Sequence, residues 1–182
     1  MTSIGDGAFD YCTNLTSATI GTGVTSIGYY AFNGCTSLVN AYYTGSVSDW
    51  SKISFESDHS YPNNYAGNFY ILGDLDFSAD DNIEEIKSNT FKSCKSLTSI
   101  TIPDSVTSIN WDAFRNCTNL ESVTIPDSVT SVGGGAFRNC TSLESITIPD
   151  SVTSVGGGAF YDCTSLETVN YNAVNCTAMG NS

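Results

Sequence analysis

The sequence has few charged residues, and basic residues are especially scarce. Only 14% of the 182 residues are charged, with six Lys or Arg against 19 Asp or Glu. Long helices favour Glu, Lys, Arg and Ala, whereas Ser, Thr, Asn and Gly fill the polar positions here and suit short strands and turns. The formal net charge is −13. Such a surface repels phosphate backbones, so we expect no nucleic-acid partner.

Long hydrophobic runs and targeting signals are also missing. No stretch of about 18 apolar residues occurs, so we expect no membrane insertion. Met1 leads directly into Thr-Ser-Ile-Gly, without the basic and apolar regions of a signal peptide. The chain begins in the middle of a repeat, and residues 172–182 diverge from the pattern. We therefore interpret it as a fragment of a longer, truncated chain.

Histidine is almost absent, and no catalytic motif accompanies the single His59. Asp58 and Ser60 flank it, but neighbours in sequence do not face one another as a catalytic triad does. No nucleophile elbow, phosphate-binding loop or zinc motif occurs. We predict that the protein is not an enzyme and has no catalytic, cofactor-binding or metal-binding residues.

The sequence is rich in one feature, a repeat of 23 residues. An aromatic residue, a cysteine and a leucine recur together at this step. The phenylalanines are Phe9, Phe32, Phe91, Phe114, Phe137 and Phe160, and a cysteine follows each three residues later, at Cys12, Cys35, Cys94, Cys117, Cys140 and Cys163. Three residue types sharing one period exclude coincidence, so the pattern predicts a stack of repeats with a continuous core.

Each unit reads L-x-x-I-x-I-P-x-x-V-x-x-I-x-x-x-A-F-x-x-C, as in residues 97–117. The L-x-x-I-x-I part is typical of a strand, and the proline that follows stops it because proline has no N–H for a ladder. A period of 23 lies in the leucine-rich-repeat range and is too short for two-helix repeats. We predict a leucine-rich-repeat solenoid with short strands and short helical turns. A parallel β-helix is the alternative, disfavoured because A-F-x-x-C is typical of a turn.

The pattern I-P-D-S-V-T-S-I-G-x-x-A-F-x-x-C-x-x-L resembles the BspA-like, or Treponema-pallidum-type, leucine-rich repeats. The resemblance covers about residues 1–43 and 77–171. It implies a right-handed solenoid from an extracellular or cell-surface protein, with a role in adhesion to host or microbial surface proteins or glycans. The resemblance supplies no catalytic residues.

An aromatic-rich island, residues 44–76, interrupts the predicted array between residues 1–43 and 77–171. Residues 48–53 are expected to form a short capped helix, and residues 68–72 a strand. Islands in solenoids often shape a binding site, and exposed Tyr and Trp are good anchors. We therefore consider Trp50, Tyr61, Tyr65 and Tyr70 as candidate ligand-binding residues. The alternative is that these rings only pack the island onto its neighbours.

The outward positions of the predicted strands are the other candidates for binding. Thr101, Thr124 and Thr147 recur there and could contact a protein or a glycan through many weak polar interactions. The alternative is that these polar side chains only keep an exposed strand face soluble and bind nothing. Taken together, the sequence predicts a non-catalytic adhesion module, or alternatively a structural spacer that carries other domains.

Two further columns follow from the repeat. The cysteines are predicted to be buried free thiols, because parallel side chains at equivalent positions do not easily reach the dihedral angle of a disulfide. Asp104, Asp127 and Asp150 recur in the turn after the first strand. Ca²⁺ needs six or more oxygen ligands, and one carboxylate per repeat is weak evidence for such a site. We therefore expect these aspartates to be solvated turn residues.

Overall fold

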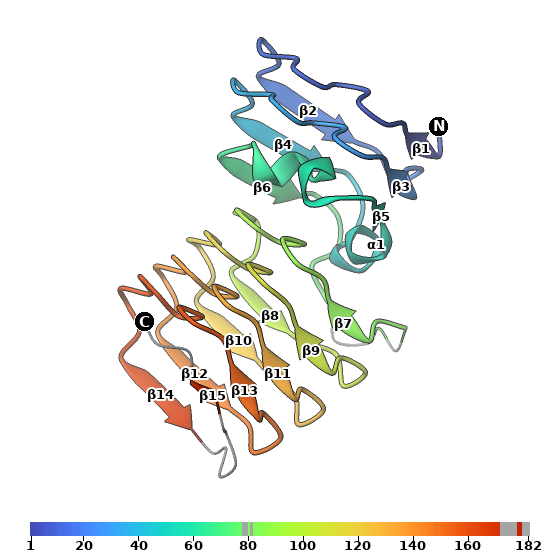
Figure 1. Cartoon of the computed structure of the whole chain (residues 1–182). Helices are drawn as coiled ribbons and strands as arrows, with labels where there is room; N and C mark the ends of the chain where they lie inside the picture. Colours follow the sequence, from blue (N-terminus) through green and yellow to red (C-terminus); the bar gives the residue numbers. More distant parts are fainter. Residues whose placement is uncertain (78–79, 81, 172–177, 180–182) are drawn as a thin grey trace.

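The computed structural model is a stack of parallel coils that starts with the N-terminal coil at one end (Figure 1). It describes residues 1–77, 80, 82–171 and 178–179. The coils contribute strands to two parallel ladders, and breaks between neighbouring coils divide the strands of these ladders into five hydrogen-bonded sheets among the described residues. The predicted leucine-rich-repeat solenoid is confirmed.

The first ladder contains the longer strands, and we call it the long-strand ladder. Its strands are β2 (Ser17–Ile20), β4 (Asn40–Tyr43), β6 (Asn68–Ile71), β8 (Ser99–Thr101), β10 (Ser122–Thr124), β12 (Ser145–Ile148) and β14 (Thr168–Tyr171). Strand β2 pairs with β4 and β4 with β6, while β8 pairs with β10 and β12 with β14. Inward and outward side chains alternate, as in Ser145–Ile148, where the two Ile side chains are buried and Ser145 and Thr147 are exposed.

The second ladder consists of two-residue strands, and we call it the short-strand ladder. Its members are β1 (Ser3–Ile4), β3 (Ser26–Ile27), β5 (Ser54–Phe55), β7 (Glu85–Ile86), β9 (Ser108–Ile109), β11 (Ser131–Val132), β13 (Ser154–Val155) and β15 (Ala178–Met179). Strand β15 lies in the segment 172–182 that the sequence pattern left unassigned, and it pairs with β13. The rest of that segment lies outside the described residues.

The A-F-x-x-C segments form turns, as predicted, and these turns close the core. Backbone bonds link them from coil to coil, for example Phe114 N to Ala136 O at 2.7 Å. The phenylalanine rings stack along the core, with centroids 5.2 Å apart for Phe114 and Phe137. Each ring buries apolar surface against its neighbours, and this repeated burial is the main force that holds the coils together.

The segment 44–76 does not project as an insertion. It contains helix α1 (Val47–Lys52), strand β5, the 3₁₀ helices η1 (Asp58–Ser60) and η2 (Pro62–Asn64), and strand β6. Strand β5 continues the short-strand ladder and β6 continues the long-strand ladder, where Asn68 pairs with the residue 28 positions earlier. The segment therefore continues both ladders from the preceding coils, although the 23-residue sequence pattern is interrupted there, and we call residues 44–76 the junction coil. The predicted helix and strand within it are confirmed.

The ladders are offset after the junction coil. Strand β6 does not pair with β8, because Phe69 forms a bridge with Cys94 instead. The short-strand ladder likewise ends at β5 and starts again at β7. Figure 1 shows the resulting step between the coils up to β6 and those from β7 onward. Helix α1 and the 3₁₀ helices lie at this step and join the two parts.

Candidate functional site

The predicted threonines lie on the solvent-exposed face of the long-strand ladder. Thr101 is in register with Thr124, and Thr147 extends outward from the next strand, β12. All three side chains are exposed. They form a polar strip whose hydroxyl groups can form hydrogen bonds with water as readily as with a ligand. The strip alone therefore does not define a binding site.

Tyr70 lies on the same face but away from these threonines. It is in register with Tyr42, and the two half-buried rings stack with centroids 5.3 Å apart and an interplanar angle of 16°. Leu72, two residues after Tyr70, is exposed. Because the ladder is offset beyond β6, Tyr70 does not reach Thr101. The structure therefore separates a tyrosine pair, Tyr42 and Tyr70, from the threonine strip.

Sequence reasoning did not select Tyr42, although a signal was present. The segments Asn40–Tyr43 and Asn68–Ile71 share an Asn and a Tyr at the same two positions. Aligning these segments would have placed both tyrosines on one face, because alternate residues of paired strands point the same way.

Trp50 and Tyr61 are buried, so the prediction that they are exposed anchors is wrong. Trp50 is 0% exposed, and its Nε1–H donates to the carbonyl of Thr90 at 2.7 Å. Tyr61 is 4% exposed and stacks on Phe55 with centroids 3.7 Å apart. The junction coil is longer than the 23-residue unit, and these large side chains fill its wider interior at the density of a protein core.

Tyr65 is half-buried at the outer edge of the turns. Its hydroxyl donates to Asn33 Oδ1 at 3.1 Å and lies 2.8 Å from Nδ1 of His59. The His59 ring also stacks on Tyr30. The single histidine therefore contacts two tyrosine side chains.

The described cysteines of the column are free thiols, as predicted, but Cys12 is exposed and Cys163 is half-buried, so the prediction that all of them are buried is wrong at these two positions. Cys117 is fully buried, and its Sγ donates to the carbonyl of Phe91 in the preceding coil at 3.0 Å. Cys140 makes the same contact with Phe114. Burial raises the pKa of both thiols well above the ordinary value. The buried thiols of the column are therefore structural and poorly reactive.

The aspartates of the repeat lie on the surface. Asp104, Asp127 and Asp150 are exposed in their turns. Among the residues that the structure describes, no group of three or more His, Cys, Asp or Glu side chains could hold a metal ion. None of the described helices is long and apolar enough to cross a membrane.

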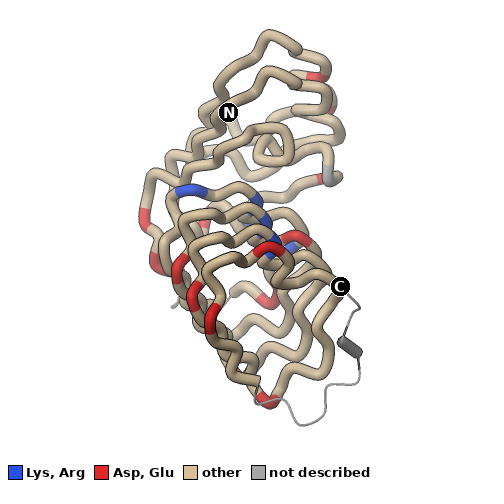
Figure 2. The backbone as a smooth tube through the Cα atoms, turned by 90° about the vertical axis from the view of Figure 1, so that its left-hand side faces the viewer, with Lys and Arg blue, Asp and Glu red and all other residues tan. Residues whose placement is uncertain are grey.

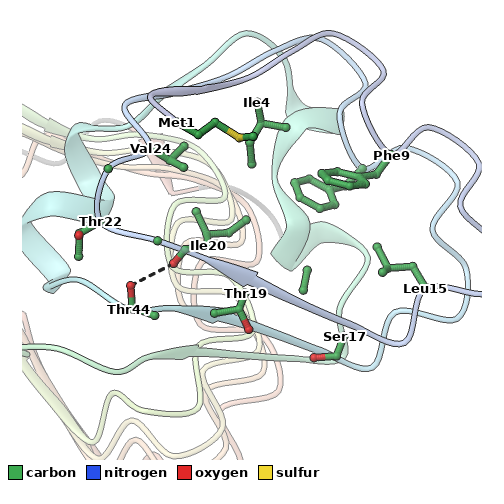
Figure 3. Close-up of a pocket in the computed structure, with 14 residues that line it drawn as sticks. Met1, Ile4, Phe9, Leu15, Ser17, Thr19, Ile20, Thr22, Val24 and Thr44 are labelled. Carbon is green, nitrogen blue, oxygen red and sulfur yellow. Dashed lines mark hydrogen bonds between the residues drawn. The ribbon is translucent and has the colours of Figure 1, made fainter.

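An apolar pocket lies at the N-terminal end of the stack (Figure 3). Its volume is about 650 Å³, and its lining includes Ile4, Phe9, Leu15 and Ile20. The equivalent side chains of later coils pack against the coil before them, for example Phe32, whose ring stacks on Phe9. The pocket is therefore the open end of the repeat core and not a separate ligand site.

Parallel coils with an inward Phe–Cys column and outward polar strands define a leucine-rich-repeat solenoid. The family described as "BspA type Leucine rich repeat region" matches residues 1–79 and 66–182 in six copies. The chain belongs to this family, and the resemblance drawn from its motif is confirmed. A comparison with curated proteins gave no match.

Several solved structures share the fold. The pneumococcal vaccine antigen PcpA has a TM-score of 0.65 at 15% identity, over 96% of this chain and 55% of that one. A leucine-rich repeat protein of Eubacterium ventriosum ATCC 27560 has a TM-score of 0.55 at 23% identity, over 95% and 58%. A leucine rich cell surface protein of Faecalibacterium prausnitzii A2-165 has a TM-score of 0.51 at 21% identity, over 98% and 73%. The chain spans less than two thirds of the first two proteins.

Proposed function

We propose that the chain is a non-catalytic binding module of a secreted or cell-surface protein, and that it engages a protein or glycan on a host or microbial surface. The family and the similar cell-surface protein of Faecalibacterium prausnitzii support the class and the location. The repeat supplies a rigid scaffold, and binding is assigned to side chains that depart from it.

The tyrosine pair is the observation that carries the proposal. At the position of Tyr42 and Tyr70 in the long-strand ladder, the other described strands have Thr or Asn, as in Thr19, Thr101 and Asn170. Two aromatic rings on neighbouring strands place a large contact area on an otherwise small and polar face. Tyrosine is common among residues that dominate binding energy, because it buries much area with little loss of conformational freedom.

The alternative function is a spacer that holds another domain away from the surface. The near-identical units 97–119, 120–142 and 143–165 favour this alternative, since a spacer needs only length and stiffness. A spacer, however, has no use for a stacked tyrosine pair on its exposed face.

The test is a screen of the purified chain against extracellular-matrix proteins and a glycan array. Each hit is repeated with the double variant Tyr42→Thr, Tyr70→Thr, which gives both strands the residue found in the other coils. A matched control replaces another exposed tyrosine, Tyr161→Ser, on the turns near the opposite end of the array. We expect the double variant to weaken binding at least tenfold and the control to leave it unchanged. A folded chain without any hit supports the spacer instead.

A further inference from the structure

The A-F turns contain a recurring backbone feature that singles out two tyrosines. In each described A-F turn, two residues have a positive φ near 60°, one before the Ala-Phe (or Thr-Phe) pair and one two residues after the Phe. At nearly all of these positions the residue is Gly, Asn, Asp or Ser. The exceptions are Tyr11, at φ 51°, and Tyr30, at φ 55°.

Tyrosine at these positions is unfavourable for folding. A side chain with a Cβ in the left-handed region costs roughly 1–2 kcal/mol, and Asn and Asp tolerate that region better than large residues do. Burial offsets little of this cost, because Tyr11 is 70% exposed and Tyr30 is 50% exposed. Strain at exposed residues is a reason to look for a function.

Both rings are held in place. The Tyr11 ring covers Gly34, where an added Cβ would come within 2.9 Å of Tyr11 Cδ1. The Tyr30 ring stacks on His59 with centroids 5.5 Å apart. Tyr30 begins the turn at residues 30–34, and Tyr11 ends the turn of the preceding coil, beside Gly34. Both tyrosines therefore lie on the same edge of the stack.

A chain of hydrogen bonds connects the coils at this edge. His59 Nδ1 lies 2.8 Å from the hydroxyl of Tyr65, and that hydroxyl donates to Asn33 Oδ1. Asn33 Nδ2 in turn donates to Asp10 Oδ1 at 2.9 Å. The Tyr65 hydroxyl thus links the His59 ring to Asn33. The network links three successive coils and fixes the ring against which Tyr30 stacks.

The surroundings of these rings are acidic. No Lys or Arg occurs before Lys52, and the chain as a whole is strongly negative. A third exposed tyrosine, Tyr29, lines a shallow pocket with Asp6 and Glu56, and its backbone N–H donates to Asp6 Oδ1 at 2.8 Å. Figure 2 shows that the basic residues gather in the central coils and leave the N-terminal coils without them.

We propose that Tyr11, Tyr29 and Tyr30, with Asp6 and Glu56, form a binding surface for an arginine- or lysine-bearing segment of a partner protein. Tyrosine faces attract cationic groups, and carboxylates add charge-assisted hydrogen bonds to guanidinium or ammonium. A neutral glycan could stack on the same rings but would make no use of the negative charge. This surface is separate from the tyrosine pair, so the two proposals stand or fall independently.

The first experiment uses a capped peptide with three Gly-Arg repeats and the same peptide with citrulline in place of arginine. Citrulline keeps the shape of arginine but removes its charge. The imidazole NMR signal of His59 reports on the site, because it is the only histidine in the chain and stacks on Tyr30. We expect saturable shifts with the arginine peptide and at least tenfold weaker binding of the citrulline peptide. Equal binding of the two peptides, or binding of a neutral cello-oligosaccharide alone, overturns the proposal.

The second experiment tests the strained tyrosines. The double variant Tyr11→Asn, Tyr30→Asn places a residue that tolerates positive φ at both positions. We expect an unchanged or higher melting temperature and at least a tenfold loss of affinity for the arginine peptide by calorimetry. Trp111→Asn, which removes a ring of similar exposure elsewhere on the turns, is the control and should bind as the parent chain does. Undiminished binding by the double variant overturns the proposal.

Discussion

Replacing Trp50 should loosen the connection between the two parts of the stack. Trp50 touches Tyr43, Phe55 and Phe69 with ring centroids 4.6–5.1 Å apart, and its N–H donates across the step to the carbonyl of Thr90. Trp50→Ala removes the ring and leaves a cavity, at a cost of about 3–5 kcal/mol. The stability of a solenoid is approximately a sum of interactions between neighbouring coils. We therefore expect the backbone amides of residues 1–71 to lose protection from hydrogen exchange before those of residues 83–171.

A milder change separates the hydrogen bond from the packing. The Thr90 carbonyl also accepts a longer bond, 3.4 Å, from Asn63 Nδ2. Trp50→Phe should therefore cost less than Trp50→Ala, because an aromatic ring remains; the lost bond accounts for about 1 kcal/mol, and the smaller ring adds a packing cost. Trp50→Phe combined with Asn63→Ala should cost more than the two single changes together, because the carbonyl then loses both partners.

The assay is hydrogen exchange by mass spectrometry together with urea unfolding. A background of Trp111→Phe leaves Trp50 as the only tryptophan, so its fluorescence reports directly on the step. An equal loss of protection from hydrogen exchange in both parts after Trp50→Ala would contradict the claim that Trp50 connects two parts that can unfold separately. So would a Trp50→Ala variant as stable as the parent chain.

Three further predictions concern individual contacts. Cys117 should resist iodoacetamide in the folded chain and react fully in urea, because burial raises the pKa of its thiol; rapid native labelling would refute this. Burial alone would raise the pKa of Asp80, but hydrogen bonds from Lys52, Ser48 and the Asn82 backbone lower it to about 2. Lys52→Ala should thus cost roughly 1 kcal/mol at neutral pH, and the difference from the parent chain should vanish in urea titrations as the pH falls from about 4 to about 2. Gly135→Ala should cost more than Gly158→Ala in thermal unfolding. Both glycines have φ +64°, but only the Cβ added at Gly135 would clash with a side-chain carboxylate, that of Asp112.

The sequence was sufficient to predict the repeating part of the fold. A 23-residue period fixes which side chains point inward, so the strands, the buried phenylalanines and the free thiol of Cys117 follow from one aligned unit. The alternation within each strand likewise places Thr101 and Thr124 outside. These predictions succeed because every coil meets nearly the same neighbours.

The junction coil could not be predicted in the same way. Trp50 and Tyr61 look identical in the sequence whether they fill a wide interior or protrude from the surface. The distinction depends on the width of the longer coil and on the offset between β6 and β8, and no residue pattern records either one. The pairing of Tyr42 with Tyr70 was available from an alignment of two short segments, but their separation from Thr101 required the offset.

The most direct test of binding through the long-strand ladder is competition for attachment of the partner. A partner from the screen is immobilised, and the soluble parent chain and the Tyr42→Thr, Tyr70→Thr variant are compared as inhibitors of parent-chain binding. We expect the parent chain to inhibit and the variant, equally folded by circular dichroism, to need at least tenfold more protein for the same inhibition. Equal inhibition by the two proteins would contradict the assignment of binding to the tyrosine pair.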